Sequence, residues 1–192
     1  IATPDRFADA AVLIPESLGG LPDKVFATSS VDALIHAAES FLSPKASPLT
    51  EILSKEAISM IMNGYKKIVE RGGNTKENRE DLLKDFILAA NYAGIAFGNA
   101  GCGAVHALSY AHGGAFHIPH GEANFICFTE VFKMYQKKQP VGKIQEVNKL
   151  FCDVLGCDEA AVYEEPEACR GKILTKQPLK EYGMTEDQVA PF

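Results

Sequence analysis

The sequence has no tryptophan, no long hydrophobic run and no concentration of basic residues. A membrane-spanning helix needs roughly 18 to 20 consecutive apolar residues, so no membrane span is expected. Acidic and basic residues are interspersed, 25 against 19, for a net charge of -6. Without a basic stripe, nucleic acid is not expected as the main partner. The segment from Ile1 to Pro4 does not begin a secretory signal peptide either.

Cysteine is present, but not in the patterns typical of disulfide frameworks. The five cysteines are odd in number and form no C-x-x-C pair. Free thiols in a reducing compartment explain them better than disulfides do, so a cytoplasmic location is expected. They are Cys102, Cys127, Cys152, Cys157 and Cys169.

Length and composition are those of an ordinary globular protein. The chain has 192 residues, 46% of them hydrophobic, which is enough to bury a core. It is short for two full domains, so we expect one domain or a piece of a longer protein. The chain starts at Ile1 rather than at methionine and stops just after an expected helix start at Thr185–Asp187. We therefore expect both ends to be artificial.

Helical periodicity dominates the chain. A short buried strand or extended segment is expected at Ala10–Ile14, an apolar run closed by Pro15. A first helix, capped by Ser29 or Ser30, should end near Ser43, because the residue before a proline is driven out of the α region. Further helices are expected at 48–68, 78–97, 104–111, 120–135, 141–155 and 179–183, with a turn at 113–114, an extended segment at 115–118 and a polar loop at 164–167. The expected fold is therefore mainly helical.

The first candidate site motif lies in the first expected helix. Asp32 and His36 are four residues apart, which places both side chains on one helical face, where they can hold one divalent cation. Such pairs also occur often on solvated faces. Small and apolar neighbours indicate a packed helix here, in which a buried acid and histidine need a partner. Glu39, on nearly the same face, can orient a ligand or can be an ordinary surface acid.

The second candidate motif is a segment rich in glycine and histidine. Gly101–Asn124 contains five glycines and four of the five histidines. A turn between His106 and His120 can bring their rings together, although two core histidines are an equal alternative. His112 lies six residues after His106 and therefore on another helical face. For His112 and His117 we favour pocket or surface roles over ligation.

Together the two motifs suggest a nitrogen-rich metal site. Asp32, His36, His106 and His120 provide three nitrogen ligands and one oxygen ligand. That set suits Fe(II), Zn(II), Co(II) or Mn(II) and is too rich in nitrogen for magnesium or calcium.

The same motifs resemble the iron-containing alcohol dehydrogenase family. The resemblance rests on S-S-V-D-A-L-I-H-A-A-E at 29–39, then G-A-V-H-A-L-S at 103–109 and H-I-P-H-G-E-A-N at 117–124. It implies that Asp32, His36, His106 and His120 bind the catalytic metal, Fe(II) or Zn(II). Within the family the chain is most similar to the 4-hydroxybutyrate dehydrogenases. It departs from many members at two positions: Ser30 replaces a glycine, and Tyr110 replaces a pocket histidine.

The resemblance also implies a larger protein. Family members carry an N-terminal α/β domain that binds the dinucleotide, whereas this chain has no G-x-G-x-x-G after a strand. Residues 1–28 would then be the end of the strand and linker from that domain, and 29–192 the helical metal-binding domain. NAD(H) would be held mainly by the N-terminal domain, and the full-length protein would be a homodimer.

The implied activity is the NAD-linked interconversion of a primary alcohol and an aldehyde. The substrate pair would be 4-hydroxybutyrate and succinate semialdehyde, and the fragment alone would be inactive. Tyr110, His112 and His117 are the candidates for proton transfer or for binding the substrate carboxylate. Two alternatives remain: a metalloenzyme of the glycerol dehydrogenase or dehydroquinate synthase type, and a non-catalytic helical metal-binding domain.

Overall fold

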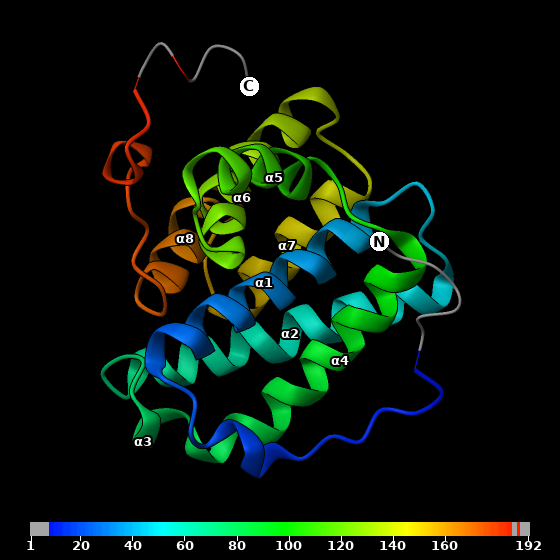
Figure 1. Cartoon of the computed structure of the whole chain (residues 1–192). Coiled ribbons are helices and arrows are strands. Elements are labelled where there is room, and N and C mark those ends of the chain that lie inside the picture. The colour runs from blue at the N-terminus through cyan, green and yellow to red at the C-terminus, as the bar shows by residue number, and fades with distance from the viewer. Residues whose placement is uncertain (1–7, 186–187, 189–192) are drawn as a thin grey trace.

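The protein is a bundle of helices, as the periodicity predicts. The computed structural model describes residues 8–185 and residue 188, and this part contains eight α-helices and no strand (Figure 1). The helices are α1 (Asp23–Leu42), α2 (Pro48–Glu70), α3 (Lys76–Arg79), α4 (Leu83–Ala100), α5 (Ala104–Phe116), α6 (His120–Lys138), α7 (Lys143–Leu155) and α8 (Glu164–Gly171). Short 3-10 turns lie at Pro15–Leu18, Glu80–Leu82, Glu159–Ala161 and Leu179–Tyr182.

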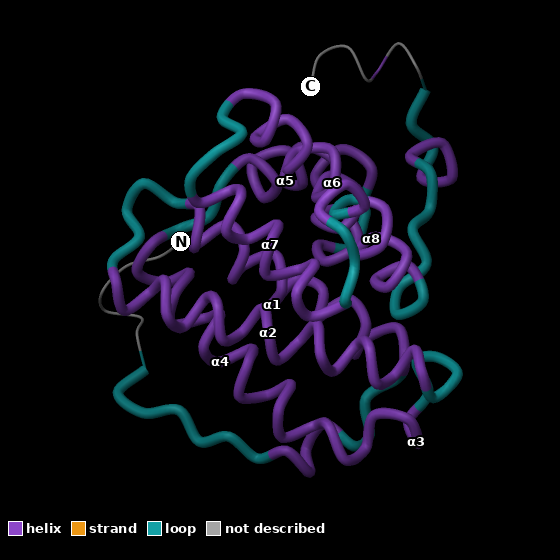
Figure 2. The backbone as a smooth tube through the Cα atoms, turned by 180° about the vertical axis from the view of Figure 1, so that it is seen from behind, coloured by secondary structure: helices purple, strands orange, loops and turns teal. Residues whose placement is uncertain are grey.

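Helix α1 lies at the centre of the bundle. It packs against α2 and α4 on one side and against α6 on the other, while α5 packs on α6 and α7 on α2 (Figures 1 and 2). Most of its apolar residues, among them Val31, Leu34 and Ile35, are fully buried. Because α1 has neighbours on both sides, some of its polar residues, such as Glu39 and Ser40, are also buried.

Several helix ends lie where the local sequence predicts them. Helix α1 ends at Leu42, directly before Ser43 and Pro44. Helix α2 begins at Pro48, where Ser47 accepts a hydrogen bond from the Thr50 backbone N–H and Thr50 caps Ser47 in return. Helix α7 ends at Gly156 in the left-handed conformation that glycine adopts without strain.

Two expectations near the N-terminus are wrong. Ala10–Ile14 is not a strand: it is extended, but the described residues contain no partner strand, and Val12 is 82% exposed. Extended backbone without a neighbouring strand has no ladder to join. Helix α1 also begins at Asp23 rather than at Ser29 or Ser30. Ser30 lies inside the helix and accepts a hydrogen bond from the buried Tyr65 hydroxyl at 2.8 Å.

The histidine-rich segment also differs from the expectation. Helix α5 continues through Gly113 and Gly114 to Phe116, and the chain turns at His117, which has a φ of 53°. Glycine inside a helix costs only about 1 kcal/mol, so packing of α5 on α6 is sufficient to keep it helical. The expectation of an extended segment at 115–118 is therefore wrong, because Ala115 and Phe116 belong to α5 and His117 is left-handed.

Three smaller differences lie elsewhere. The helix expected at 78–97 is interrupted by the 3-10 turn at Glu80–Leu82, and the one at 179–183 is itself a 3-10 turn. The expected polar loop at 164–167 is the start of α8, because Pro166 lies in the first turn, where its lack of an N–H breaks no helical bond. The helix start expected at Thr185–Asp187 falls partly on Glu186 and Asp187, outside the described residues. None of the helices within the described ranges is long and apolar enough to span a membrane.

Candidate metal centre

Three helices bring the four expected metal ligands together. Asp32 and His36 lie on α1, His106 on α5 and His120 at the first position of α6. One ligand atom from each lies within 4.8 Å of all the others. The Asp32 oxygens are 3.7 Å from His36 Nδ1, 3.6 Å from His106 Nε2 and 3.5 Å from His120 Nε2. Two ligands bonded at about 2.1 Å to one tetrahedral ion lie about 3.4 Å apart, so the spacing fits a shared metal.

A close approach of two helices brings His120 to the cluster. A Cβ atom at Gly121 would collide with the backbone carbonyl of Thr28 on α1. Glycine at this position therefore lets the start of α6 approach α1, and the preceding His120 faces Asp32. The glycine in the H-G pair is thus a packing requirement of the site.

Replacing Gly121 by alanine is therefore expected to weaken metal binding and folding together. The added methyl group forces α6 away from α1, and overpacking of this kind destabilises by about 1–3 kcal/mol. Urea unfolding and Co(II) titration measure the two effects. Gly114→Ala is the matched control, since nothing lies within 4 Å of its Cβ position, and it should leave both quantities unharmed. Normal Co(II) affinity in Gly121→Ala would contradict this role.

Glu39 supports the cluster from behind. Its side chain is 1% exposed, so the alternative of an ordinary surface acid is wrong. The carboxylate accepts hydrogen bonds from the Val105 backbone N–H at 2.7 Å and the His106 backbone N–H at 3.3 Å, and lies 2.7 Å from His106 Nδ1. With the proton on Nδ1, the His106 Nε2 lone pair faces the other ligands. A carboxylate behind a histidine is a common arrangement around bound metals.

Charges in the cluster shift the protonation of the ligands. Burial raises the pKa of Asp32, but the adjacent imidazoles of His106 and His36 outweigh it, so the pKa is below its usual range. Burial lowers the pKa of His36, and Asp32 offsets this only in part. Burial also lowers the pKa of His106, but the carboxylates of Asp32 and Glu39 outweigh it and raise the pKa to about 9. A metal that binds at neutral pH must therefore displace a proton from this site.

Asn124 is a member of the cluster that the sequence analysis did not identify. It lies on α6 one turn after His120, and its Nδ2 is 2.6 Å from Asp32 Oδ1. The same nitrogen is 3.1 Å from Nε2 of both His106 and His120. The four-residue spacing from His120 is the signal in the sequence that could have indicated it.

The three candidate catalytic residues differ in their solvent exposure and in their contacts. Tyr110 is 60% exposed, and its ring stacks on that of His120 with centroids 5.8 Å apart. His112 is buried in α5, and burial lowers the pKa of its imidazole. His117 is exposed at the turn between α5 and α6. Among the described residues, neither His112 nor His117 belongs to a group of side chains that could hold a metal ion.

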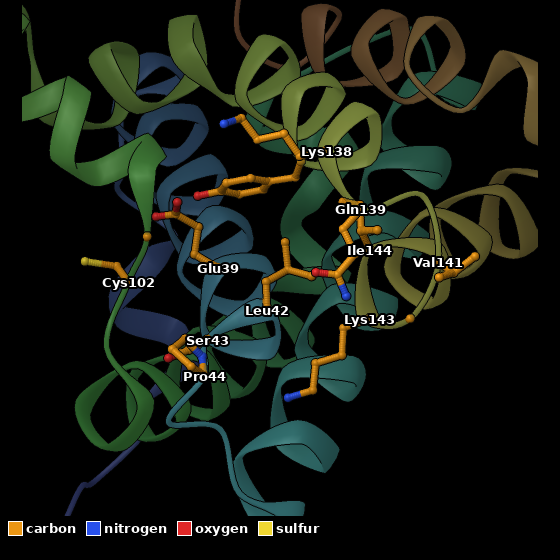
Figure 3. A pocket seen from close by; sticks show the side chains of 13 residues that line it. Glu39, Leu42, Ser43, Pro44, Cys102, Lys138, Gln139, Val141, Lys143 and Ile144 are labelled. Atoms are coloured by element: carbon orange, nitrogen blue, oxygen red, sulfur yellow. The ribbon is translucent and has the colours of Figure 1, made fainter.

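A cavity of about 640 Å³ lies next to the cluster (Figure 3). It shares Glu39 with the metal centre, and its other lining residues come from the end of α1 and the residues just after it, the α4–α5 connection, the C-terminal part of α6, the α6–α7 connection and the start of α7. Cys102 also lines it, with its thiol within 4.8 Å of ligand atoms of Glu39 and His106. Since Glu39 already accepts bonds from two backbone N–H groups, we assign no second metal site here.

The helical fold thus carries a cluster of three imidazoles and one carboxylate that could hold one metal ion. Residues 26–192 match the family described as "Fe-containing alcohol dehydrogenase family, C-terminal". The chain therefore belongs to the iron-containing alcohol dehydrogenase family, as the sequence motifs predicted.

Individual relatives agree with this membership. The chain is 52% identical over all 192 residues to a protein from Clostridium kluyveri named 4-hydroxybutyrate dehydrogenase, and it spans 51% of that protein's length. An iron-containing alcohol dehydrogenase from Thermococcus thioreducens superimposes with a TM-score of 0.79 at 26% identity, over 98% of this chain and 47% of that one. A 1,3-propanediol oxidoreductase gives a TM-score of 0.74 at 26% identity, over 90% and 45% of the two chains. The chain thus spans about half the length of the relatives it matches.

Proposed function

We propose that this chain is the metal-bearing part of an NAD-linked oxidoreductase that interconverts 4-hydroxybutyrate and succinate semialdehyde. The observation that carries the proposal is the convergence of Asp32, His36, His106 and His120 within 4.8 Å, in a chain of the iron-containing alcohol dehydrogenase family. The similarity to a 4-hydroxybutyrate dehydrogenase over the whole chain supports the choice of substrate.

The residues of the cluster would hold Fe(II) or Zn(II). When bound, such an ion supplies Lewis acidity that lowers the pKa of an alcohol hydroxyl, so that hydride can leave for the nicotinamide. Asp32 contributes negative charge to the site. Glu39 fixes the His106 ring through the 2.7 Å contact with Nδ1, which keeps Nε2 directed at the metal position. Tyr110, whose ring stacks on that of His120, would then be placed for proton transfer.

The proposal includes parts outside this chain. NAD(H) would be bound mainly by an N-terminal dinucleotide domain. The boundary expected between residues 28 and 29 falls inside α1, so the helical metal domain would begin at Asp23. The full-length protein would act as a homodimer in the cytoplasm. The cluster then faces the cleft between the two domains.

Substrate choice can be tested at His117 in the full-length protein. A protonated imidazole at the turn between α5 and α6 would pair with the far carboxylate of 4-hydroxybutyrate. His117→Asn removes this charge, and asparagine tolerates the left-handed backbone of His117. Loss of a charged hydrogen bond is worth about 1.5–3 kcal/mol, so KM for 4-hydroxybutyrate should rise by about tenfold or more.

The comparison substrate is 1-butanol, which has no carboxylate, and its KM should stay unchanged. Equal losses on both substrates would remove His117 from substrate binding. NAD-dependent oxidation of neither alcohol by the metal-loaded, full-length protein would contradict the proposed function itself.

A further inference from the structure

The carboxamide of Asn124 lies against the metal cluster without solvent contact. Its side chain is on α6, one turn beyond His120, and the residue is 0% exposed. The amide nitrogen has three neighbours, at 2.6 Å from Asp32 Oδ1 and 3.1 Å from two imidazole nitrogens. Its oxygen Oδ1 is buried and has no hydrogen-bond partner among the residues that the structure describes. The amide is therefore directed at the cluster through its nitrogen.

The two protons of the Asn124 amide show which of these three contacts can be hydrogen bonds at the same time. An N–H2 group has two protons to donate, so it can donate to at most two of these three neighbours. The contact with Asp32 is the shortest, and a hydrogen bond to an ionised carboxylate is about twice as strong as one between neutral groups. When His106 and His120 use Nε2 to bind a metal, those lone pairs are no longer available. Asp32 keeps further lone pairs, so its bond from Asn124 can persist beside a metal.

We propose that Asn124 is a positioning residue of the metal centre, which orients the Asp32 carboxylate by donating an N–H to Oδ1. This inference rests on the proposed function, because it requires the cluster to bind a divalent metal. The backbone of α1 fixes the position of the Asp32 Cα atom but not the orientation of its carboxylate. Without Asn124 the carboxylate has no donor from α6, and metal binding must then order it at the cost of side-chain entropy.

Two other roles would explain the same position. Asn124 could be a direct ligand through Oδ1, in which case its loss changes the number of ligands on the ion. It could also only fill space between α1 and α6, in which case the variant with the larger void suffers more. The three roles predict different metal affinities, different spectra of the bound metal and a different order of affinity for the Asn124 variants.

The experiment uses Co(II) titration of the purified protein, followed by the visible absorption of the bound ion. Asn124→Leu keeps the branched shape of the side chain but has no donor, whereas Asn124→Ala leaves space in which water can donate to Asp32. A lost outer partner of a metal ligand typically lowers affinity about 10–100-fold, so we expect this loss in Asn124→Leu. Asn124→Ala should lose less affinity but more stability towards urea, and both should keep the wild-type Co(II) spectrum.

Asn148→Leu is the matched control. Asn148 is a buried asparagine on α7 whose N–H2 donates to Gln136 and Tyr163. Within the described part of the chain its Oδ1 also has no hydrogen-bond partner. The Asn148→Leu variant should lose stability without losing Co(II) affinity. Wild-type affinity in both Asn124 variants, a greater loss in Asn124→Ala than in Asn124→Leu, or a changed spectrum would each overturn the inference. Failure of the unmodified protein to bind Co(II) would overturn the proposed function as well.

Discussion

Replacing His120 by alanine is expected to lower metal affinity by roughly 100-fold to 1,000-fold. Structural zinc sites with four ligands bind with about 10–16 kcal/mol, so one ligand of four is worth roughly 3–4 kcal/mol. His120 suits this test because its side chain is 46% exposed at the start of α6, and its loss leaves little empty space in the core. Metal content after dialysis and the Kd for Co(II) measure the effect.

The matched control for that variant is His117→Asn, which changes another exposed histidine three residues away. It should keep the metal content and the Co(II) affinity of the unmodified protein, since His117 lies outside the cluster. Asp32→Ala, His36→Ala and His106→Ala should each show the loss seen in His120→Ala. If all four variants keep full metal occupancy, these residues are not the ligands.

Replacing Glu39 by alanine should damage both folding and metal binding. Two backbone N–H groups and the Nδ1 of His106 lose their shared acceptor inside the protein. An unsatisfied buried donor costs about 1–3 kcal/mol, so the free energy of unfolding should fall by about 3–5 kcal/mol. Domains of ordinary stability have only about 5–15 kcal/mol, so the variant should be close to unfolding at 25 °C. Urea unfolding measures this loss.

Glu39→Gln separates the two effects of Glu39. The glutamine oxygen can still accept from the Val105 N–H, so most of the stability should return. Its neutral amide is a weaker partner for His106 Nδ1, so Co(II) affinity should remain about tenfold or more below that of the unmodified protein. The control is Glu122→Gln, a buried acid that pairs with Lys24 and Tyr182 instead of a ligand. Equal Co(II) affinity in Glu39→Gln and Glu122→Gln would exclude a special role for Glu39.

The sequence predicted correctly those helix ends that depend on one or two neighbouring residues. The end of α1 before Pro44 and the start of α2 at Pro48 follow from the fixed geometry of proline. The end of α7 at Gly156 follows from the tolerance of glycine for left-handed backbone. Asp32 and His36 share a face because four residues make about one helical turn, whatever the rest of the chain does.

The wrong expectations have tertiary causes. Gly113 and Gly114 suggested a turn, but α5 packs on α6 and remains helical beyond them. Ser29 and Ser30 suggested a helix start, but α1 is extended back to Asp23, whose carboxylate pairs with the buried Arg79 guanidinium of α3. Contacts between distant segments outweigh propensities of about 1 kcal/mol.

The helical class, the family and the four candidate ligands could be predicted from the sequence, because helical spacing and motif order are properties of the chain alone. The burial of Glu39 behind His106 and the hydrogen bond from Asn124 to Asp32 could be found only from the packed helices. Those pairs are separated by 67 and 92 residues. Such partners meet only where α5 and α6 pack against α1, and a short range of sequence does not encode that packing.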